Sequence, residues 1–264
     1  TNLLRKDFIQ NIQINALELK DIEGRANYFD HVGILRDMLQ SHLLQILAYL
    51  TMDMPKDLNY KSVHHEKSKI LKAIKIKDIR NSFVRGQYDL YKKSIGTKSK
   101  TETFAALKLT LNHSLWKNIP IYFRTGKALQ TQWTSIVIEF KKNANLSPNR
   151  IVIQLQPYEK IEFHLLTKLG GKTFDFHELT TGRPIYCSGD CINEHSRLLL
   201  DVIAGKKALF LNFEEIYAAW KVIDPLQKYC NDCHKTKVKH PHTQIYKTGS
   251  LGPLESDLLL KRDG

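Results

Sequence analysis

Cysteine, methionine, tryptophan and glycine-rich turns are all scarce in this chain of 264 residues. Four cysteines are too few for a disulfide scaffold at this length, so we expect a reducing compartment, the cytoplasm. The most apolar run, residues 42–52, has about half of the roughly 20 residues that cross a bilayer, so we expect no membrane span. Internal repeats and low-complexity tracts are lacking as well.

Phosphate-binding loops are a further absence. The chain contains no Gly-x-Gly-x-x-Gly, no other Gly-rich strand-to-helix turn and no Walker-type loop. A nucleotide-binding half of the usual kind is therefore expected to lie outside it. The chain opens at Thr1 and not at a methionine, so we expect a processed chain or a part of a longer protein.

Acidic residues are outnumbered, with 27 Asp and Glu against 40 Lys and Arg, for a net charge of +13. An excess of this size suits a phosphorylated substrate, a nucleotide cofactor or nucleic acid. The basic residues are scattered and are not interleaved with exposed aromatics, as a nucleic-acid groove would require. Nucleic acid is therefore the least expected of the three partners.

The first third of the chain reads as one strand and two helices. Residues 8–18 alternate between apolar and polar side chains, which predicts a strand with one wet face that ends at Glu18. A helix is expected from Asp30 until Pro55 stops it, and a second one over residues 60–76. The apolar stripe of the first helix comprises Leu35, Leu39, Leu43, Ile46 and Leu50.

From residue 104 the apolar period changes to two. Alternating runs predict strands that begin near 104 and span 119–125, 134–141, 150–156 and 160–167. Two helices, 193–205 and 213–228, are expected to follow. Strands gathered in a block with helices at both ends indicate an α+β fold, with a large, mostly antiparallel sheet and helices packed on one face.

Polar residues that include Asp37 and His42 crowd the helix after Asp30, and a solvated helix face would explain them equally well. The segments around them resemble glucose-6-phosphate dehydrogenases, in the same order over more than 200 residues. The matching segments are Asn27-Tyr-Phe-Asp30, Arg36-Asp37, Gln40-Ser-His42, Thr103-Phe-Ala-Ala106, Arg124-Thr-Gly-Lys-Ala-Leu129, Gln156-Pro157, Arg197-Leu-Leu-Leu-Asp201 and Asp224-Pro-Leu226.

The resemblance implies that residues 1–264 are the C-terminal, substrate-binding domain of such an enzyme. The implied reaction oxidises glucose 6-phosphate to 6-phosphogluconolactone with NADP, which the absent N-terminal Rossmann domain would mainly bind. The family also implies a homodimer formed through the sheet. The missing half leaves an alternative open, a stand-alone, non-catalytic homologue that acts as a structural or regulatory binding module.

The resemblance also assigns roles to single residues. His42 stands at the position of the catalytic base, which takes the proton of the C1 hydroxyl. Glu18 and Asp37 match acids that hold sugar hydroxyls, and Lys127 and Gln156 match residues beside the substrate. Gln132 stands where many family members carry a substrate-facing basic residue, so it is a divergent candidate contact.

Some members of the family bind a second, structural NADP, for which several basic residues are needed. At those positions this chain has Trp133, Val137, Gln154 and Leu251, and only Arg124 remains basic. We therefore predict no structural NADP site.

The cysteines fall into two pairs, Cys187 with Cys191 and Cys230 with Cys233. The second pair lies in Cys-x-x-Cys-His, the pattern of c-type haem attachment, but no secretory context supports haem. If the two last helices form a hairpin, the loops that flank it could bring four thiolates around a zinc ion. Four reduced thiols without a metal are the alternative.

Overall fold

The computed structural model describes residues 6–22, 24–96, 99–142, 146–168, 170–172, 175–185, 192–235 and 243–261. Within these residues the strands form one sheet in the order β10-β3-β4-β5-β1-β6-β7-β8-β9, with β2 paired to β4. The strands are β1 Ile9–Leu17, β2 Ile74–Lys75, β3 Phe83–Tyr88, β4 Phe104–Leu111, β5 Ile121–Gly126, β6 Trp133–Phe140, β7 Arg150–Gln156, β8 Lys160–Lys168, β9 Phe176–Pro184 and β10 Gln244–Tyr246.

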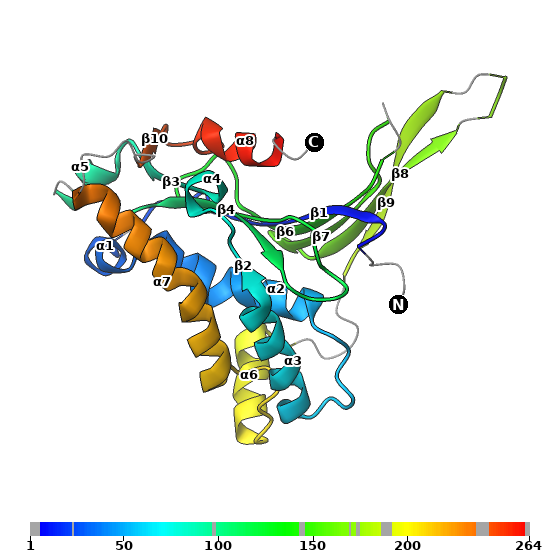
Figure 1. The fold of residues 1–264 in the computed structure, drawn as a ribbon, viewed down its shortest axis with the longest axis horizontal. Helices are drawn as coiled ribbons and strands as arrows, with labels where there is room; N and C mark the ends of the chain where they lie inside the picture. The colour runs from blue at the N-terminus through cyan, green and yellow to red at the C-terminus, as the bar shows by residue number, and fades with distance from the viewer. Residues whose placement is uncertain are drawn as a thin grey trace.

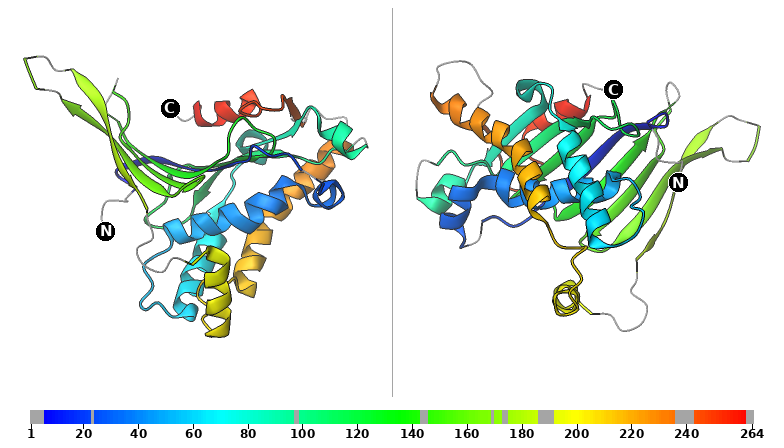
Figure 2. Two further views of the ribbon diagram at one scale, coloured as in Figure 1. Left: turned by 180° about the vertical axis from the view of Figure 1, so that it is seen from behind. Right: turned by 60° about the horizontal axis from the view of Figure 1, so that its bottom comes forward.

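The helices gather mainly on one side of this sheet. They are α1 Ala26–Ile34, the π-helix η1 Leu35–Leu43, α2 Leu44–Thr51, α3 Tyr60–Ala73, α4 Ile79–Ser82, α5 Tyr91–Ile95, α6 Glu194–Ile203, α7 Phe213–Lys235 and α8 Leu254–Lys261. Figures 1 and 2 show η1, α2, α3 and α7 below the sheet, whereas α8 lies on its opposite face. The predicted α+β fold with a large, mostly antiparallel sheet is confirmed.

The core lies between the middle of the sheet and the helix pair η1–α2. Ile12 and Ile14 of β1 are fully buried and belong to the same apolar cluster as Leu35, Leu39 and Leu43 of η1. Burying such a side chain contributes about 1.5–3 kcal/mol relative to leaving it in water. This cluster therefore fixes the helical layer on the sheet, and the apolar stripe predicted from the sequence is the stripe that is buried.

The pairing of β1 is the unusual feature of the sheet. β1 runs parallel to β5 on one side and antiparallel to β6 on the other, whereas most of the neighbouring strands are antiparallel. Parallel neighbours end at the same edge of a sheet. The segments that follow β1 and β5 therefore leave the sheet side by side.

The outer strands extend beyond the helical layer. Figures 1 and 2 show β8 and β9 projecting from the body of the molecule. Every residue of β9 is exposed, so this strand has no buried face. This explains why its sequence, which lacks apolar alternation, did not predict a strand.

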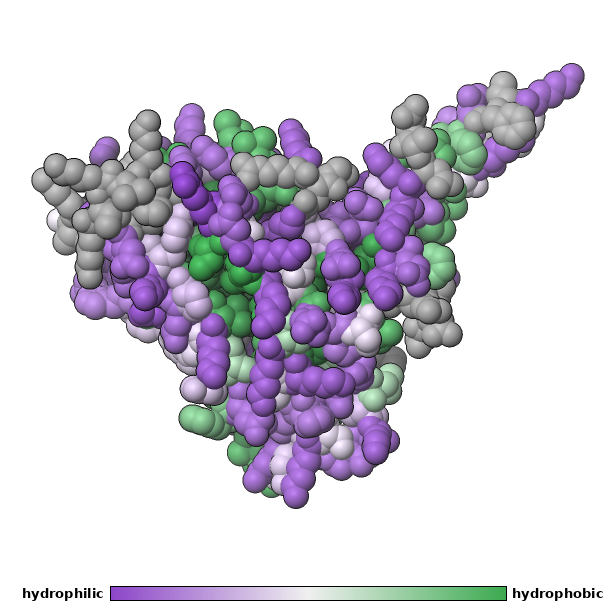
Figure 3. Space-filling model, in the orientation of Figure 1, coloured by the Kyte–Doolittle hydropathy of each residue, from purple (hydrophilic) through white to green (hydrophobic). Residues whose placement is uncertain are grey.

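The surface of the helical layer is mostly hydrophilic on the face seen in Figure 3. Apolar residues show in the recess between α7 and the segment from α3 to α4, a hollow of about 450 Å³ whose apolar lining includes Leu71, Ile74, Ile79, Ala218 and Val222. Among the described residues, no helix combines the length and the apolar character that a membrane crossing demands.

The first predicted helix is interrupted where the sequence suggested continuity. Gly33 has φ +71°, a backbone conformation that residues with a side chain rarely adopt, and it kinks the chain inside α1, just before η1 begins. The backbone N–H of Ile34 then donates to the carbonyl of Glu102 at 3.0 Å. A Cβ atom at Gly33 would lie 2.5 Å from Oε1 of Glu102. Glycine is therefore needed here both for its conformation and for the close approach.

We expect Gly33→Ala to lower the free energy of unfolding by about 2–4 kcal/mol, because it adds overpacking against Glu102 to the left-handed strain. Gly24→Ala is the matched control, since Gly24 has the same φ of +71° and no atom within 4 Å of its Cβ position. It is expected to lose only about 1–2 kcal/mol. Denaturant unfolding of both variants measures the difference, and equal losses would show that Glu102 contributes nothing.

Candidate functional site

Four neighbouring strands meet at one edge of the sheet, where the predicted substrate residues lie. Leu17 at the end of β1 pairs with Gly126 at the end of β5, so Glu18 and Lys127 follow side by side. Two backbone bonds of 2.9 Å, from Glu18 N–H to the Gly126 carbonyl and from Leu129 N–H to the Glu18 carbonyl, join the two segments. The parallel pairing therefore places the acid next to the lysine.

The other two strands bring amide side chains to the same edge. Trp133 at the start of β6 pairs with Leu17, so Gln132 precedes β6 at this edge. The Gln132 side chain accepts from Leu19 N–H at 3.3 Å and donates to Oε1 of Gln156 at 3.2 Å. The Thr134 hydroxyl donates to the same oxygen of Gln156 at 3.1 Å. Both glutamines are thus part of one hydrogen-bonded row.

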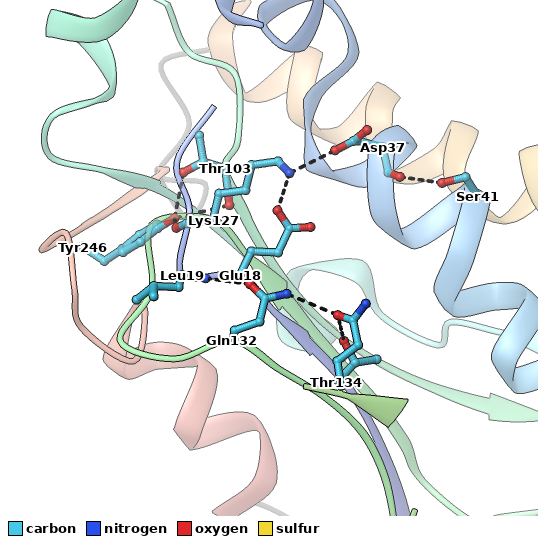
Figure 4. Close-up of polar contacts among 10 residues, drawn as sticks. Glu18, Leu19, Asp37, Ser41, Thr103, Lys127, Gln132, Thr134 and Tyr246 are labelled. Atoms are coloured by element: carbon cyan, nitrogen blue, oxygen red, sulfur yellow. Dashed lines mark hydrogen bonds and ion pairs between the residues drawn. The ribbon is translucent and has the colours of Figure 1, made fainter. Parts of the chain in front are cut away.

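A buried lysine between two carboxylates forms the centre of the site. Nζ of Lys127 lies 2.6 Å from Oε2 of Glu18 and 3.2 Å from Oδ2 of Asp37. Figure 4 shows the lysine between the two carboxylates. The lysine is 2 % exposed, while the two carboxylate side chains are 23 % and 19 % exposed. The carboxylates therefore lie on the solvent side of the cluster, and they separate the ammonium group from water. We call Glu18, Asp37 and Lys127 the acid–lysine cluster.

Residues that sequence reasoning missed hold Lys127 in place. Its N–H donates to the Thr103 carbonyl at 3.0 Å, and the Tyr246 hydroxyl donates to its carbonyl at 2.7 Å. Burial raises the pKa of Tyr246, which keeps this hydroxyl protonated as a donor. The Phe29 ring lies 5.3 Å from Nζ, within cation–π range. Phe29 stands inside a matching segment, Asn27 to Asp30, but no sequence signal pointed to Tyr246.

Asp37 and His42 share the π-helix η1. The N–H of Leu44 bonds to the carbonyl of Leu39, five residues earlier, and the Ser41 hydroxyl donates to the Asp37 carbonyl. In an α-helix residues five apart point in different directions, whereas the i→i+5 bonding of a π-helix brings them onto neighbouring turns. The side chains of Asp37 and His42 therefore point in more similar directions in the π-helix than they would in the expected α-helix.

His42 itself stands apart from the acid–lysine cluster. Its side chain is exposed and has no hydrogen-bond or ion-pair partner among the residues that the structure describes. The structure thus brings five of the six predicted site residues together in two contact groups, the acid–lysine cluster and the glutamine pair, which meet through the backbone of Leu19. The sixth, His42, is left free to meet a ligand.

The arrangement is suited to a ligand with several hydroxyl groups. Carboxylate oxygens and glutamine oxygens accept from hydroxyls, and an exposed imidazole can take up a proton. Two carboxylates and one ammonium give the acid–lysine cluster a formal charge of −1, which disfavours direct contact with a phosphate group. The chemistry of the cluster therefore fits a neutral, hydroxyl-bearing part of a ligand.

Several of the positions that would form a structural NADP site in other family members make contacts with one another or with α8 here. Arg124 donates to Asp257 of α8 at 2.9 Å and to the Leu251 carbonyl, and Nε1 of Trp133 donates to Gln154 at 3.2 Å. The absence of a structural NADP site stays a prediction.

The zinc hypothesis falls largely outside the described residues, since Cys187, Cys191 and the side chain of Cys233 are not among them. The helix that was expected to end at residue 228 runs to Lys235, so Cys230 lies inside α7 and not in a loop after it. Cys230 is buried, with 4 % exposure. Over the ranges that the structure describes, no group of three or more His, Cys, Asp and Glu side chains could hold a metal ion.

The fold and this site define a class, α+β domains in which four adjacent strands converge on a buried lysine between two acids. The family model of the glucose-6-phosphate dehydrogenase C-terminal domain matches residues 1–264, and the chain belongs to this family. It is 36 % identical over 284 residues to the glucose-6-phosphate 1-dehydrogenase of Buchnera aphidicola subsp. Schizaphis graminum (strain Sg), and 34 % identical over 291 residues to that of Bacillus subtilis (strain 168). Each comparison covers 97 % of this chain and 57 % of the relative, so the chain spans little more than half of their length.

Solved structures agree with this assignment. The glucose-6-phosphate 1-dehydrogenase from Mycobacterium avium superimposes with a TM-score of 0.84 at 27 % identity, over 97 % of this chain and 55 % of that chain. A glucose-6-phosphate dehydrogenase in complex with its substrate glucose-6-phosphate superimposes with a TM-score of 0.83 at 30 % identity, over 99 % of this chain and 56 % of that chain.

Lys127→Met is expected to lower the free energy of unfolding by about 2–4 kcal/mol, because it leaves two neighbouring carboxylates without their buried counter-charge. Lys72→Met is the control, since Lys72 pairs with Glu214 on the surface, where both side chains are more than half exposed. Its loss should stay below about 1 kcal/mol. Chemical unfolding of the two variants side by side tests whether the acid–lysine cluster is a structural element, and similar losses would contradict it.

Proposed function

We propose that this chain is the substrate-binding portion of a glucose-6-phosphate 1-dehydrogenase, which oxidises glucose 6-phosphate to 6-phosphogluconolactone in the first step of the pentose phosphate pathway. The acid–lysine cluster is the observation that carries the proposal, since it offers carboxylate acceptors to sugar hydroxyls at the edge where four strands meet. Family membership over the whole chain and the relative solved with glucose 6-phosphate support it.

In this proposal different residues of the site contact different parts of the sugar. Glu18 and Asp37 accept hydrogen bonds from its hydroxyl groups, and Lys127 holds both carboxylates in place by pairing with them. Gln132 and Gln156 extend the polar row along the same edge, and their amides can both donate and accept. Because the cluster is formally negative and Gln132 is neutral, the phosphate end must find its cations on other residues.

His42 is the proposed general base. Oxidation at C1 requires that the C1 hydroxyl lose its proton as the hydride leaves, so a base must stand beside it. An exposed imidazole on the same π-helix as Asp37 can meet a sugar that the cluster holds. With no partner of its own in the described residues, the ring depends on the ligand, or on another part of the protein, for orientation.

NADP, the proposed hydride acceptor, does not fit the residues of this site. The chain has no Gly-rich phosphate-binding turn, and the two carboxylates at the centre of the site would repel a pyrophosphate. We propose that a part of the protein outside these residues binds the coenzyme, in keeping with the greater length of the relatives.

We expect His42→Asn to lower kcat by about 10²–10⁴-fold in the intact polypeptide, because the proton of the C1 hydroxyl loses its acceptor. The KM for glucose 6-phosphate should change little, since the cluster still holds the sugar. Steady-state NADPH production measures both constants. His65→Asn, an exposed histidine on α3, is the control and should keep wild-type kcat. An unchanged kcat in His42→Asn would exclude His42 as the base, and an intact wild-type protein without any turnover would favour the non-catalytic binding module.

We further propose that two copies pair through the sheet. Phe163, Leu165 and Leu179 are 42 %, 39 % and 50 % exposed, and Leu165 of β8 lies directly opposite Leu179 of β9. Apolar side chains on one face of neighbouring exposed strands are typical of a surface that another chain covers.

Leu165→Asp combined with Leu179→Asp should therefore convert a dimer into a monomer, because each charge would be buried unpaired in the interface. Sedimentation velocity reports the change in mass. Leu58→Asp, at a loop position that is 79 % exposed, should leave the dimer intact. A wild-type protein that sediments as a monomer would rule out this interface.

A further inference from the structure

A cavity lined by several lysines lies away from the acid–lysine cluster. It has a volume of about 670 Å³ and is formed where the beginning of β1, the end of β4, the loop between β4 and β5, and the ends of β2 and β6 come together. Its described lining comprises Lys6, Asp7, Ile9, Gln10, Lys77, Lys108, Thr110, Lys117, Asn118, Ile119, Pro120 and Lys141. We call this cavity the lysine groove, after its five lysines.

The lysine groove and the proposed sugar site are at opposite ends of β1. Gln10 lines the groove, whereas Glu18 follows the other end of the strand, and eight residues of extended chain span about 26 Å. Figure 1 shows β1 running from the side of the N-terminus across the sheet toward α1. The two sites share no residue, so the groove has no part in holding the sugar.

The charges of the groove are poorly compensated. Asp7 is the one acidic side chain in its described lining. Lys6, Lys77, Lys117 and Lys141 take part in no ion pair with any residue that the structure describes. By contrast, other lysines of the chain, such as Lys69 and Lys160, have carboxylate partners within 3 Å. A concave surface lined by charges of one sign focuses the field and concentrates counter-ions.

The lining also indicates what kind of anion fits. Lysine ammonium groups are compact point charges that suit phosphate oxygens, and Gln10, Thr110 and Asn118 add neutral hydrogen-bond donors. Lys108 and Thr110 alternate along β4 with buried leucines, so both side chains lie on the same face of the strand. The volume is within the range of small-molecule sites. Several cations spread along one groove match a chain of linked phosphates better than a single phosphate.

A base or a nucleic-acid strand fits less well. No aromatic side chain and no arginine stands in the described lining, so the groove offers no surface on which a base could stack. Its apolar lining, Ile9, Ile119 and Pro120, is aliphatic. Recognition would therefore rest on the phosphates alone.

We propose that the lysine groove is a binding site for a small oligophosphate, a molecule with several linked phosphate groups, whether or not a nucleoside is attached. The phosphate oxygens bridge lysines that come from distant parts of the chain. Bound oligophosphate therefore ties the start of β1 to β4 and to the loop before β5, and it stabilises the folded state by mass action.

The test is isothermal titration calorimetry of the intact protein with inorganic triphosphate as the probe. Wild-type protein should bind it, and the affinity should fall steeply when salt rises from ~50 to ~300 mM, because the contacts are charge–charge contacts. Adenosine 5′-triphosphate should bind with an affinity similar to that of triphosphate. Saturating glucose 6-phosphate should leave triphosphate binding unchanged, since the two sites do not overlap.

Lys117→Gln combined with Lys141→Gln should weaken triphosphate binding by about tenfold or more. The control is Lys92→Gln with Lys93→Gln on α5, which removes the same charge from an exposed helix outside the groove and should keep wild-type affinity. The thermal unfolding midpoint of each variant without ligand checks that it is folded.

Three results would overturn the proposal. An equal loss in the α5 variant would mean that triphosphate responds only to net charge. Competition by glucose 6-phosphate would place triphosphate in the sugar site. Binding of a single-stranded oligonucleotide, with none of triphosphate, would point to nucleic acid instead.

Discussion

The parallel pairing of β1 with β5 in the middle of the sheet is the constraint on which the candidate site depends. Most other neighbours in this sheet are antiparallel, and an antiparallel β5 would carry Lys127 to the far edge. With both strands ending together, Glu18 and Lys127 emerge as neighbours, and the antiparallel β6 and β7 bring Gln132 and Gln156 to the same edge. The sheet thus collects side chains that are up to 138 residues apart in the sequence.

A buried ammonium group is costly unless it is paired, and this fixes the position of the π-helix relative to the sheet. Lys127 belongs to the sheet edge and Asp37 to η1, so their ion pair crosses the interface between the two layers. The apolar contacts of Leu35 and Leu39 bind the helical layer to the sheet. The ion pair adds a contact that forms only when Asp37 of the π-helix lies beside Lys127. The same carboxylates that compensate the lysine are the groups that face solvent and can accept from a ligand.

The backbone conformation of Gly33 affects how the helix that carries the proposed base is wound. Gly33 kinks the last turn of α1 and lets the backbone N–H of Ile34 reach the carbonyl of Glu102, after which the chain winds as a π-helix. Glu102 is itself buried, and this burial raises the pKa of its carboxyl. An uninterrupted α-helix, which the apolar stripe predicts equally well, would turn Asp37 and His42 away from each other.

The sequence by itself determined the fold class, most of the strands and the helical stripe, because burial of one face imposes periods of two and 3.6 that can be read directly. It did not reveal β9, which has no buried face, or β3, where Gly86 and Arg85 break the apolar pattern. Family resemblance indicated the six site residues, but their contacts depend on strand register and on the π-helix, which are set by pairings between distant segments. The lysine groove is the clearest case, since its five lysines are scattered over 136 residues and only the tertiary structure brings them to one cavity.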